Sequence, residues 1–428
     1  MSGLAVLAAV FVVYALVASR LDRWSITAPM VFAAAGFLLG PNALNVLPFR
    51  IGDEVALTVV ELTLALLLFA DASTVRLREV EGDAQLPGRL LLIGLPLTIA
   101  AGTVAAALMF PAGGWAAAAV IGTILAPTDA ALGLAVFADP NVPVRLRRAL
   151  NVESGLNDGL ATPFLTLFLA LLVSEEAIGY GSWAVKATEQ IGLAIVAALA
   201  VGAAGGLLLS AARERGWTSP ISEQLAILSL ALLSYAGSIA IGGNGFVAAF
   251  VAGLLFGATT RGAMQRPVEF TETFALFLSF LVWALFGALL VGPVITTGFA
   301  FAPLAYAALS LTVIRMVPVG LAWMGVGLRP RTIAFAGWFG PRGLASVVFT
   351  TLAVQTLHGA GIAADTIVQV ATWTILLSVV LHGLTAAPLS RRYGRWIAGQ
   401  PGVMPELASA PEPRIRRRSL GHRESGSA

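Results

Sequence analysis

The chain has 428 residues, of which 58% are hydrophobic and 11% are charged, and its mean hydropathy is +0.87. This composition excludes a water-soluble globular protein, because so little polar surface cannot cover so many apolar side chains. The sequence pI of about 9.7 follows largely from a basic C-terminal tail, so nucleic acid is not expected as a partner. Cysteine is absent, which excludes disulfides and thiolate metal sites, and no cofactor is expected.

Apolar runs long enough to cross about 30 Å of hydrocarbon as helices recur along nearly the whole chain. The first run precedes the first charged residue, Arg20, so it is expected to stay as a helix and not to be removed as a signal peptide. Charge clusters and turn residues divide the runs into about thirteen helices, which predicts an all-α polytopic membrane protein. These helices are centred near residues 11, 33, 64, 99, 125, 160, 200, 231, 250, 281, 311, 345 and 377.

The cationic residues predict the orientation of these helices, because cytoplasmic loops are enriched in Arg and Lys. With the N-terminus outside, the inner loops and the tail hold 22 of the 26 cations, and the outer loops hold only Arg50 and Lys186. The other two, Arg315 and Arg342, lie inside spans. One helix more or fewer would scramble this asymmetry. We therefore expect residues 1–398 to form a multi-pass domain of the inner membrane, with an odd number of spans and a cytoplasmic C-terminus.

Residues 399–428 carry prolines, serines and the cluster RIRRR, with too little apolar surface to pack. A disordered, basic, cytoplasmic tail is expected. Its charge either only fixes the topology or also contacts anionic membrane lipids.

Ionisable side chains within the spans are the candidates for function, because each costs at least about 2.5 kcal/mol at the middle of a membrane helix. Each one therefore needs a partner, a cavity or a role. They are Glu61 and Asp71 in the third span, Asp129 in the fifth, Glu153 and Asp158 in the sixth, Arg315 in the eleventh and Arg342 in the twelfth.

The sixth span reads NVESGLNDGLATPF and places two polar stripes on one helix. Ser154 and Asp158 are four residues apart, and their oxygens are hard ligands suited to a small alkali cation. Glu153 and Asn157 form the adjoining stripe. We expect Glu153 to form an ion pair with Arg342, and the alternative is that these groups only tie helices together.

The fifth and twelfth spans each place a helix breaker beside a charge, in APTDAA and FGPRGLA. Irregular backbone at membrane depth is tolerated where it is buried or lines a watery cavity, so both helices are expected to be broken. They lie seven spans apart, which fits two inverted six-helix repeats, spans one to six and eight to thirteen, whose broken helices cross near the midplane. Asp129 can then offset the positive half-helix ends and Arg342 the negative ones, while the Thr128 carbonyl can face a cation. A proline kink capped by Thr128 and Asp129 is the simpler alternative.

Three motifs resemble those of the monovalent cation/proton antiporters, specifically the sodium/proton exchanger branch that includes the NhaP-type prokaryotic proteins. APTDAA is similar to the threonine and aspartate motif of that family's unwound fifth helix, and ESGLNDG is similar to its sixth-helix motif. GPRGLAS is similar to the arginine motif of the second unwound helix. The likeness extends from about residue 5 to residue 395.

The resemblance implies that Asp158 is the carboxylate shared by the cation and the proton. Ser154, the Thr128 backbone and Asp129 would surround the cation, so that Asp158, Ser154 and Thr128 supply its ligands. Glu153 and Arg342 would be the family's structural ion pair.

The resemblance has three further implications. Asn157 before the key aspartate implies electroneutral exchange of one proton per cation. Glu61 and Asp71 compete as the acid of the third span, because the family's usual LFE is LFA here, with Ala70 at the last position. A homodimer is expected from the family alone.

The mechanism needs only competition for one carboxylate. Desolvation favours the protonated form of Asp158 and a bound cation favours the ionised form, so each ligand expels the other. If the empty carboxylate cannot cross, alternating access couples the two gradients.

Two other classes of protein compete with this interpretation. A cation channel would also use carboxylates along a wet path. An intramembrane hydrolase would pair Asp129 with Asp158, or a serine with His382 or His358. The arginine of the twelfth span has no role in that chemistry.

Overall fold

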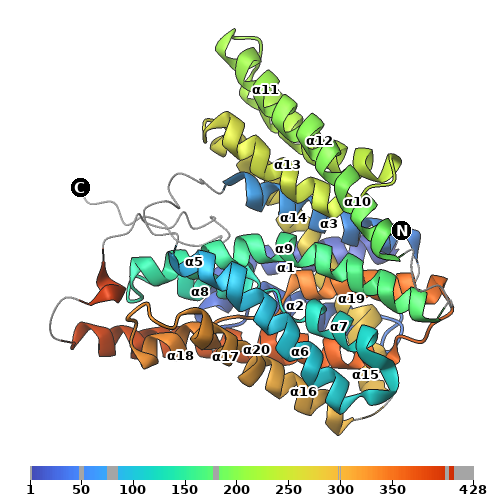
Figure 1. The fold of residues 1–428 in the computed structure, drawn as a ribbon, viewed down its shortest axis with the longest axis vertical. Helices are drawn as coiled ribbons and strands as arrows, with labels where there is room; N and C mark the ends of the chain where they lie inside the picture. Colours follow the sequence, from blue (N-terminus) through green and yellow to red (C-terminus); the bar gives the residue numbers. More distant parts are fainter. Residues whose placement is uncertain are drawn as a thin grey trace.

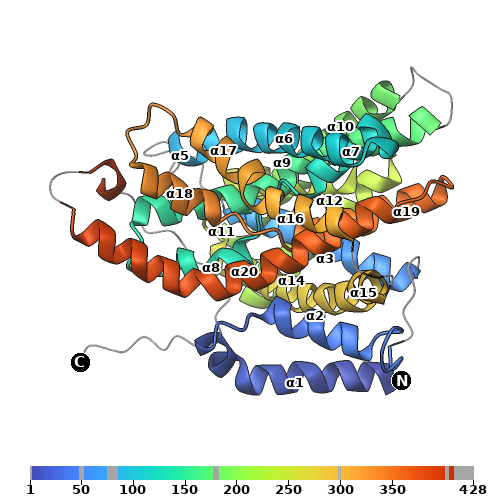
Figure 2. The same ribbon diagram turned by 90° about the horizontal axis from the view of Figure 1, so that it is seen from below.

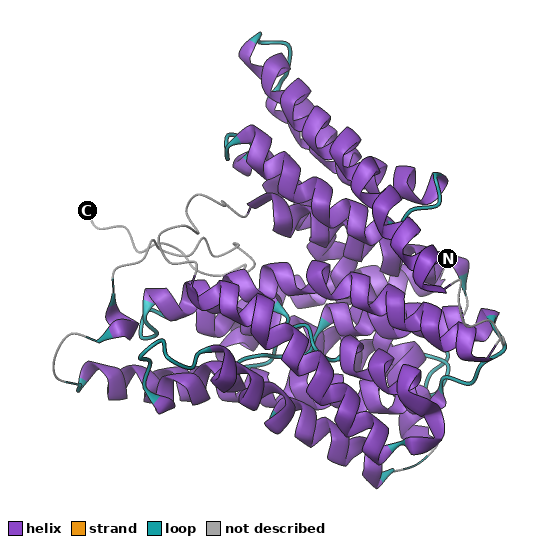
Figure 3. Ribbon diagram, in the orientation of Figure 1, coloured by secondary structure: helices purple, strands orange, loops and turns teal. Residues whose placement is uncertain are grey.

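The computed structural model describes residues 2–47, 53–74, 85–176, 183–296, 298, 300–400 and 404–408. Within these ranges the chain is helical and forms no strand (Figure 3). Among the described residues, nine helical segments are long and apolar enough to span a membrane, and four shorter apolar helices lie between them in the chain. Together they account for the thirteen predicted spans, so the predicted fold class is confirmed. Arg50, Arg76, Arg78 and the arginines of residues 409–428 lie outside the described ranges.

The first six spans run from α1 to α9. The first three are the single helices α1 (Ser2–Arg23), α2 (Ala28–Leu39) and α3 (Glu54–Thr74). The fourth joins α5 (Gln85–Arg89) to α6 (Leu95–Met109) through a π-helical turn, Leu90–Gly94. The fifth consists of α7 (Gly114–Ile124) and α8 (Ala130–Phe137), and the sixth is α9 (Val144–Glu176).

The seventh span joins α10 (Trp183–Ala198) to α11 (Ala204–Glu214). The eighth to tenth are α12 (Pro220–Ala240), α13 (Gly245–Thr260), and α14 (Gln265–Phe286) followed by α15 (Gly292–Thr296). The last three are α16 (Phe301–Leu311) with α17 (Val313–Ala322), α18 (Pro330–Trp338) with α19 (Leu344–Gly359), and α20 (Asp365–Ala398).

The helices pack into two groups. In one group, α3 packs on α13 and α14, α14 on α2, and α12 on α13. In the other, α6 packs on α7, α7 on α9, α16 on α20, and α17 on α18. Figure 1 shows α3, α12, α13 and α14 in the upper half of the view and α16, α17, α18 and α20 in the lower half. Helix α9 of the second group contacts α3 of the first, and so does α19, which packs on α20 and α7. The two groups therefore meet along α3, α9 and α19.

Close packing within the first group depends on small residues. A Cβ atom at Gly36 of α2 would lie 1.9 Å from the Ala284 carbonyl oxygen, and one at Gly287 would lie 2.0 Å from the Ala33 carbonyl oxygen. The two backbones therefore meet where neither helix carries a side chain. This contact fixes α2 against the end of α14.

One part of the C-terminal tail differs from the sequence prediction. Residues Pro405–Leu407 form a 3-10 turn, and buried Glu406 accepts hydrogen bonds from Arg329 N and Thr332 Oγ1 at 2.8 and 2.9 Å. Arg145 Nη1 donates to Pro405 O at 2.7 Å. Disorder is thus the wrong description for this turn, because its carboxylate caps the N-terminus of α18. Residues 401–403 and 409–428 lie outside the described ranges.

Candidate ion-binding site

The fifth and twelfth spans are both interrupted, as predicted. Residues 125–129 separate α7 from α8, and residues 339–343 separate α18 from α19. The two breaks are hydrogen-bonded to each other, since Asp129 N donates to Pro341 O at 2.8 Å and Ser346 Oγ donates to Ile124 O at 2.7 Å. The predicted crossing of two broken helices is therefore confirmed, and a simple proline kink is excluded.

The Asp129 carboxylate accepts hydrogen bonds from the N-terminal ends of two helices, α8 and α19. Its Oδ1 accepts from Ala131 N and Leu132 N at 2.6 and 3.0 Å, which caps α8. Its Oδ2 accepts from Leu344 N at 2.7 Å, which caps α19. Three N–H donors suit an ionised carboxylate, and they account for most of its acceptor capacity. The contacts thus confirm the prediction that Asp129 offsets positive half-helix ends, and they show no side chain of the sixth span bonded to it.

Arg342 lies at the negative, C-terminal end of a half-helix. Its guanidinium donates from Nη1 to Ala126 O at 2.6 Å and to Pro127 O at 3.2 Å. These are carbonyls that follow the C-terminus of α7, where the partial charge is negative. The side chain is fully buried. The prediction that Arg342 offsets negative half-helix ends is confirmed.

Thr128 links the fifth break to the sixth span. Its Oγ1 lies 2.9 Å from Ser154 Oγ and accepts from Asn157 Nδ2 at 2.7 Å. All three side chains are buried. Asp158 follows Asn157 on α9 and lies one turn beyond Ser154, and it is half-buried. The predicted cation ligands Thr128 and Ser154 therefore lie together, whereas Asn157, which was predicted beside Glu153 and Arg342, donates to Thr128 instead. The role of Asp158 as the shared carboxylate stays a prediction.

The predicted partner of Glu153 is wrong. Glu153 forms a buried, two-pronged ion pair with Arg315 of α17, at 2.5 Å from Nη1 to Oε1 and 2.8 Å from Nη2 to Oε2. A guanidinium fits a carboxylate in this fork geometry, and Arg342 is already engaged by backbone carbonyls. Buried Glu153 therefore does have a cationic side chain as its partner, as predicted, but that side chain is Arg315 of the eleventh span and not Arg342 of the twelfth.

The two acids of the third span lie in different surroundings. Glu61 accepts a hydrogen bond from Tyr235 OH of α12 at 2.9 Å. Asp71 is buried near the last turn of α3, and Ala70 beside it is also buried. Neither acid has a described hydrogen bond to Thr128, Ser154 or Asn157. The choice between them as a third-span ligand stays a prediction.

Helix α20 supports the twelfth break in a way that the sequence did not predict. Ser378 Oγ accepts from Arg342 N at 2.6 Å, and His382 Nε2 lies 2.7 Å from Trp338 O. Ser378 and His382 meet at 3.3 Å as a serine and histidine pair, but both are engaged with the broken backbone. Their buried positions on an apolar helix were the only available signal, and a hydrolytic pair is not indicated by these contacts.

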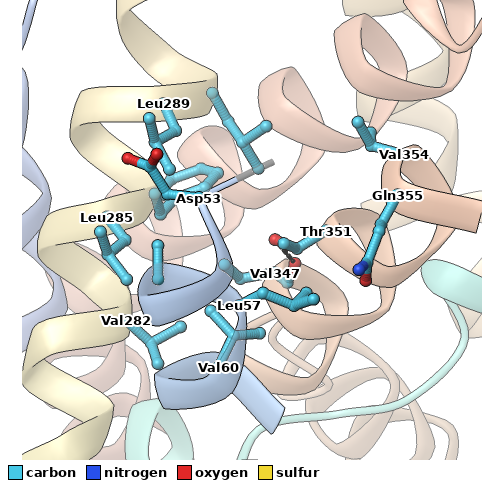
Figure 4. A pocket seen from close by; sticks show the side chains of 13 residues that line it. Asp53, Leu57, Val60, Val282, Leu285, Leu289, Val347, Thr351, Val354 and Gln355 are labelled. Carbon is cyan, nitrogen blue, oxygen red and sulfur yellow. Dashed lines mark hydrogen bonds between the residues drawn. The ribbon is translucent and has the colours of Figure 1, made fainter. Parts of the chain in front are cut away.

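A narrow cavity lies where the two helix groups meet, between α3, α14 and α19 (Figure 4). Its volume is about 40 Å³, which is room for little more than one water molecule. Its walls are mostly apolar, and Asp53, Thr351 and Gln355 are its polar members. Val347 in its wall lies one turn beyond Leu344, which contacts Asp129. The cavity therefore lies beside the first turns of α3 and along α19, and its nearest wall is about one turn from the crossing.

A family model described as "Sodium/hydrogen exchanger, transmembrane" matches residues 6–392. The chain belongs to the sodium/hydrogen exchanger family. This family consists of transporters, so the motif resemblance is confirmed at the level of the family.

Two relatives named as antiporters are distant from this chain in sequence. The K(+)/H(+) antiporter NhaP2 of Shewanella sp. (strain ANA-3) is 24% identical over 90% of this chain and 66% of its own length. The Na(+)/H(+) antiporter ApNhaP of Aphanothece halophytica is 23% identical over 85% of this chain and 73% of its own length. The chain thus spans just under two thirds of the NhaP2 relative.

The fold has a solved counterpart in the sodium proton antiporter MjNhaP1 of Methanocaldococcus jannaschii at pH 8. The TM-score is 0.71 at 20% identity, covering 93% of this chain and 99% of the other. At this identity the likeness shows the fold of the exchanger family and leaves the site to be argued from this chain's own residues.

Proposed function

We propose that this protein is a secondary antiporter that exchanges one monovalent alkali cation for one proton by alternating access. The observation that carries the proposal is the charge count at the crossing. Three carboxylates, Asp129, Glu153 and Asp158, lie at or beside the broken helices together with two guanidinium groups, Arg315 and Arg342. Among these five groups the carboxylates outnumber the guanidinium groups by one when Asp158 is ionised, and a proton or a monovalent cation bound at Asp158 would remove that difference.

The count explains why the two ligands would exclude each other. The charges of Asp129, Glu153, Arg315 and Arg342 serve helix ends or one another. Asp158, a half-buried carboxylate one turn beyond Ser154, is the group that we propose gains and loses the proton during a cycle. A loaded site carries no net charge, whereas an empty one carries a charge that is expensive to move through a low-dielectric barrier. Only the loaded carboxylate would cross, and the two gradients become coupled.

The proposed cation ligands are Asp158, Ser154 and Thr128, with Asp129 reaching the cation at most through water. Ser154 and Thr128 now hydrogen-bond each other, and a cation would replace that contact with two hydroxyl ligands. Hydroxyl, carboxylate and carbonyl oxygens are the ligands that alkali cations prefer. Relatives are named for K(+)/H(+) and for Na(+)/H(+) exchange, so sodium, lithium and potassium are all to be assayed.

We infer that the domain lies in the inner membrane as the arginine pattern predicts, with the N-terminus outside and the C-terminus in the cytoplasm. Arg20 stacks on exposed Trp24 and Arg215 on exposed Trp217, with guanidinium carbons 5.1 Å from the ring centroids. Such pairs suit the lipid headgroup region of the inner leaflet. A homodimer is proposed from the family.

The test is Asp158→Asn in proteoliposomes, with a pH-sensitive dye reporting proton flux as each alkali salt is added. Cation-dependent flux is expected to disappear, because the amide can neither ionise nor exchange a proton. Asp365→Asn is the matched control, since Asp365 is an exposed carboxylate at the start of α20. Retained exchange in Asp158→Asn, or single-channel currents in the unaltered protein, would refute the proposal.

A valinomycin clamp tests the stoichiometry in the same vesicles. Exchange of one cation for one proton moves no net charge, so the imposed potential should leave the rate nearly unchanged. A strong response would show electrogenic transport.

A further inference from the structure

The break in the twelfth span leaves backbone groups that its own helices cannot pair. The last carbonyls of α18 and the first N–H groups of α19 have no partners within those helices. At membrane depth each unsatisfied group is costly. Asp129 takes one of these N–H groups, that of Leu344.

Two residues of α20 contact unpaired backbone groups of this break, one on each side of it. Ser378 Oγ accepts from Arg342 N at 2.6 Å, on the α19 side. His382 Nε2 lies 2.7 Å from Trp338 O, at the end of α18, where an imidazole N–H can donate to the carbonyl. Ser378 and His382 are four residues apart, so they occupy one face of α20, and both are buried. One turn of a continuous helix therefore sets the span of the interruption.

Ring contacts hold the histidine in place. The Trp338 ring stacks on the His382 ring with centroids 5.1 Å apart, and the Phe339 ring meets it edge-on at 6.4 Å. His382 Nδ1 lies 2.9 Å from Ser378 O and 3.3 Å from Ser378 Oγ. Both ring nitrogens thus have a partner in this orientation of the ring.

A continuous series of contacts joins this face of α20 to the proposed cation ligands. Ser378 holds the backbone of Arg342, and the side chain of Arg342 holds Ala126 O and Pro127 O. The next residue, Thr128, contacts Ser154 and Asn157 of α9. A shift of Arg342 therefore moves the segment that carries Thr128.

We propose that Ser378 and His382 are positioning residues for cation binding, acting through Arg342 on the unwound segment at Thr128. The inference rests on the proposed function and assigns it two residues that do not touch the ion. Their loss lowers cation affinity, whereas the proton-exchanging carboxylate stays intact.

The experiment compares Ser378→Ala with Ser378→Thr, and His382→Phe with His382→Gln, in the full chain. Ser378→Ala and His382→Phe each remove one partner of the broken backbone, and the conservative variants keep a hydroxyl or an N–H donor. We expect the first pair to raise the cation concentration for half-maximal flux about tenfold, the effect of one lost buried hydrogen bond, with little change in maximal flux. The conservative variants should restore it.

Thr385→Val is the matched control. Thr385 lies on the same helix and accepts from Trp338 Nε1 at 3.0 Å, so its loss removes a bond to Trp338 without touching the backbone of the break. Its half-saturation concentration should stay at the value of the unaltered protein. An equal rise in Thr385→Val would mark a general packing effect and overturn the proposal.

Cation-induced thermal stabilisation gives a second readout that does not depend on transport. The shift in melting temperature on adding the cation should shrink in Ser378→Ala and His382→Phe and persist in Thr385→Val. An unchanged shift in the first two variants would overturn the positioning role while leaving the antiporter intact. An unaltered protein that shows neither flux nor a cation-induced shift would instead overturn the proposed function itself.

Discussion

The break in the fifth span carries a negative side chain and the break in the twelfth span a positive one. Comparing their contacts shows why each position has the charge that it has. The fifth break holds a carboxylate, Asp129, which takes N–H groups at the starts of α8 and α19. The twelfth break holds a guanidinium, Arg342, which takes carbonyls beyond the end of α7. Each charge serves a helix end of the other break. The sign at each position is therefore set by the helix polarity that it faces, and neither break is satisfied alone.

The breaks also differ in what lies behind them. The fifth break turns Thr128 toward Ser154 and Asn157 on α9, beside Asp158. The twelfth break is held from behind by Ser378 and His382 on α20. One break thus faces the proposed ion site and the other supports it. Figure 2 shows α20 running across most of the width of the bundle, as a support of this kind requires.

The largest effect is expected from Arg342→Met, which removes the guanidinium from the twelfth break. Ala126 O and Pro127 O lose their donor, and the crossing loses a positive charge. We expect a loss of about 3 kcal/mol or more in the free energy of unfolding and no cation-dependent proton flux. Arg331→Met, at an exposed arginine of α18, is the control and should stay within about 1 kcal/mol of the unaltered protein. Normal flux in Arg342→Met would contradict the reciprocal arrangement.

A smaller effect is expected from Gly343→Ala, which tests the fifth-break side of the comparison. A Cβ atom at Gly343 would lie 2.1 Å from Asp129 Oδ2 and 2.4 Å from its Cγ, so the carboxylate would have to leave Leu344 N. Overpacking of this kind costs about 1 to 3 kcal/mol. Gly359→Ala, at the far end of the same helix, meets no atom within 4 Å and is the matched control. Equal unfolding curves for Gly343→Ala and Gly359→Ala would show that the hydrogen bond from Leu344 N to the Asp129 carboxylate does not contribute to stability.

The smallest effect is expected from Ser346→Ala, which removes one neutral contact between the breaks. Ser346 Oγ donates to Ile124 O at 2.7 Å. A typical buried hydrogen bond of this kind contributes about 1 kcal/mol. Stability should fall by about that amount in denaturant unfolding, while the cation concentration for half-maximal flux stays unchanged. A loss as large as that of Arg342→Met would mean that the hydroxyl, and not the charges, holds the crossing.

Sequence reasoning identified the groups at the crossing but assigned one partner wrongly. Prolines beside Asp129 and Arg342 at membrane depth indicated broken helices, and the polarity of helix ends indicated which charge serves which end. Glu153 was paired with Arg342 when Arg315 is its partner. A buried Glu153 needs a cationic partner, and the eleventh and twelfth spans each hold a buried arginine. Only the packing of the helices shows that Arg315 of α17, and not Arg342, reaches it.

The amino-acid sequence by itself determined the membrane class, the thirteen spans, both interruptions and the acids available for exchange. These features follow from hydropathy, from proline and from the cost of charge in hydrocarbon, which are properties of single residues and short segments. The tertiary structure alone decided the partners: Arg315 for Glu153, Ser378 and His382 for the broken backbone, and Glu406 for the start of α18. An unpaired backbone group accepts any suitable donor or acceptor nearby, so its partner is chosen by packing and not by sequence.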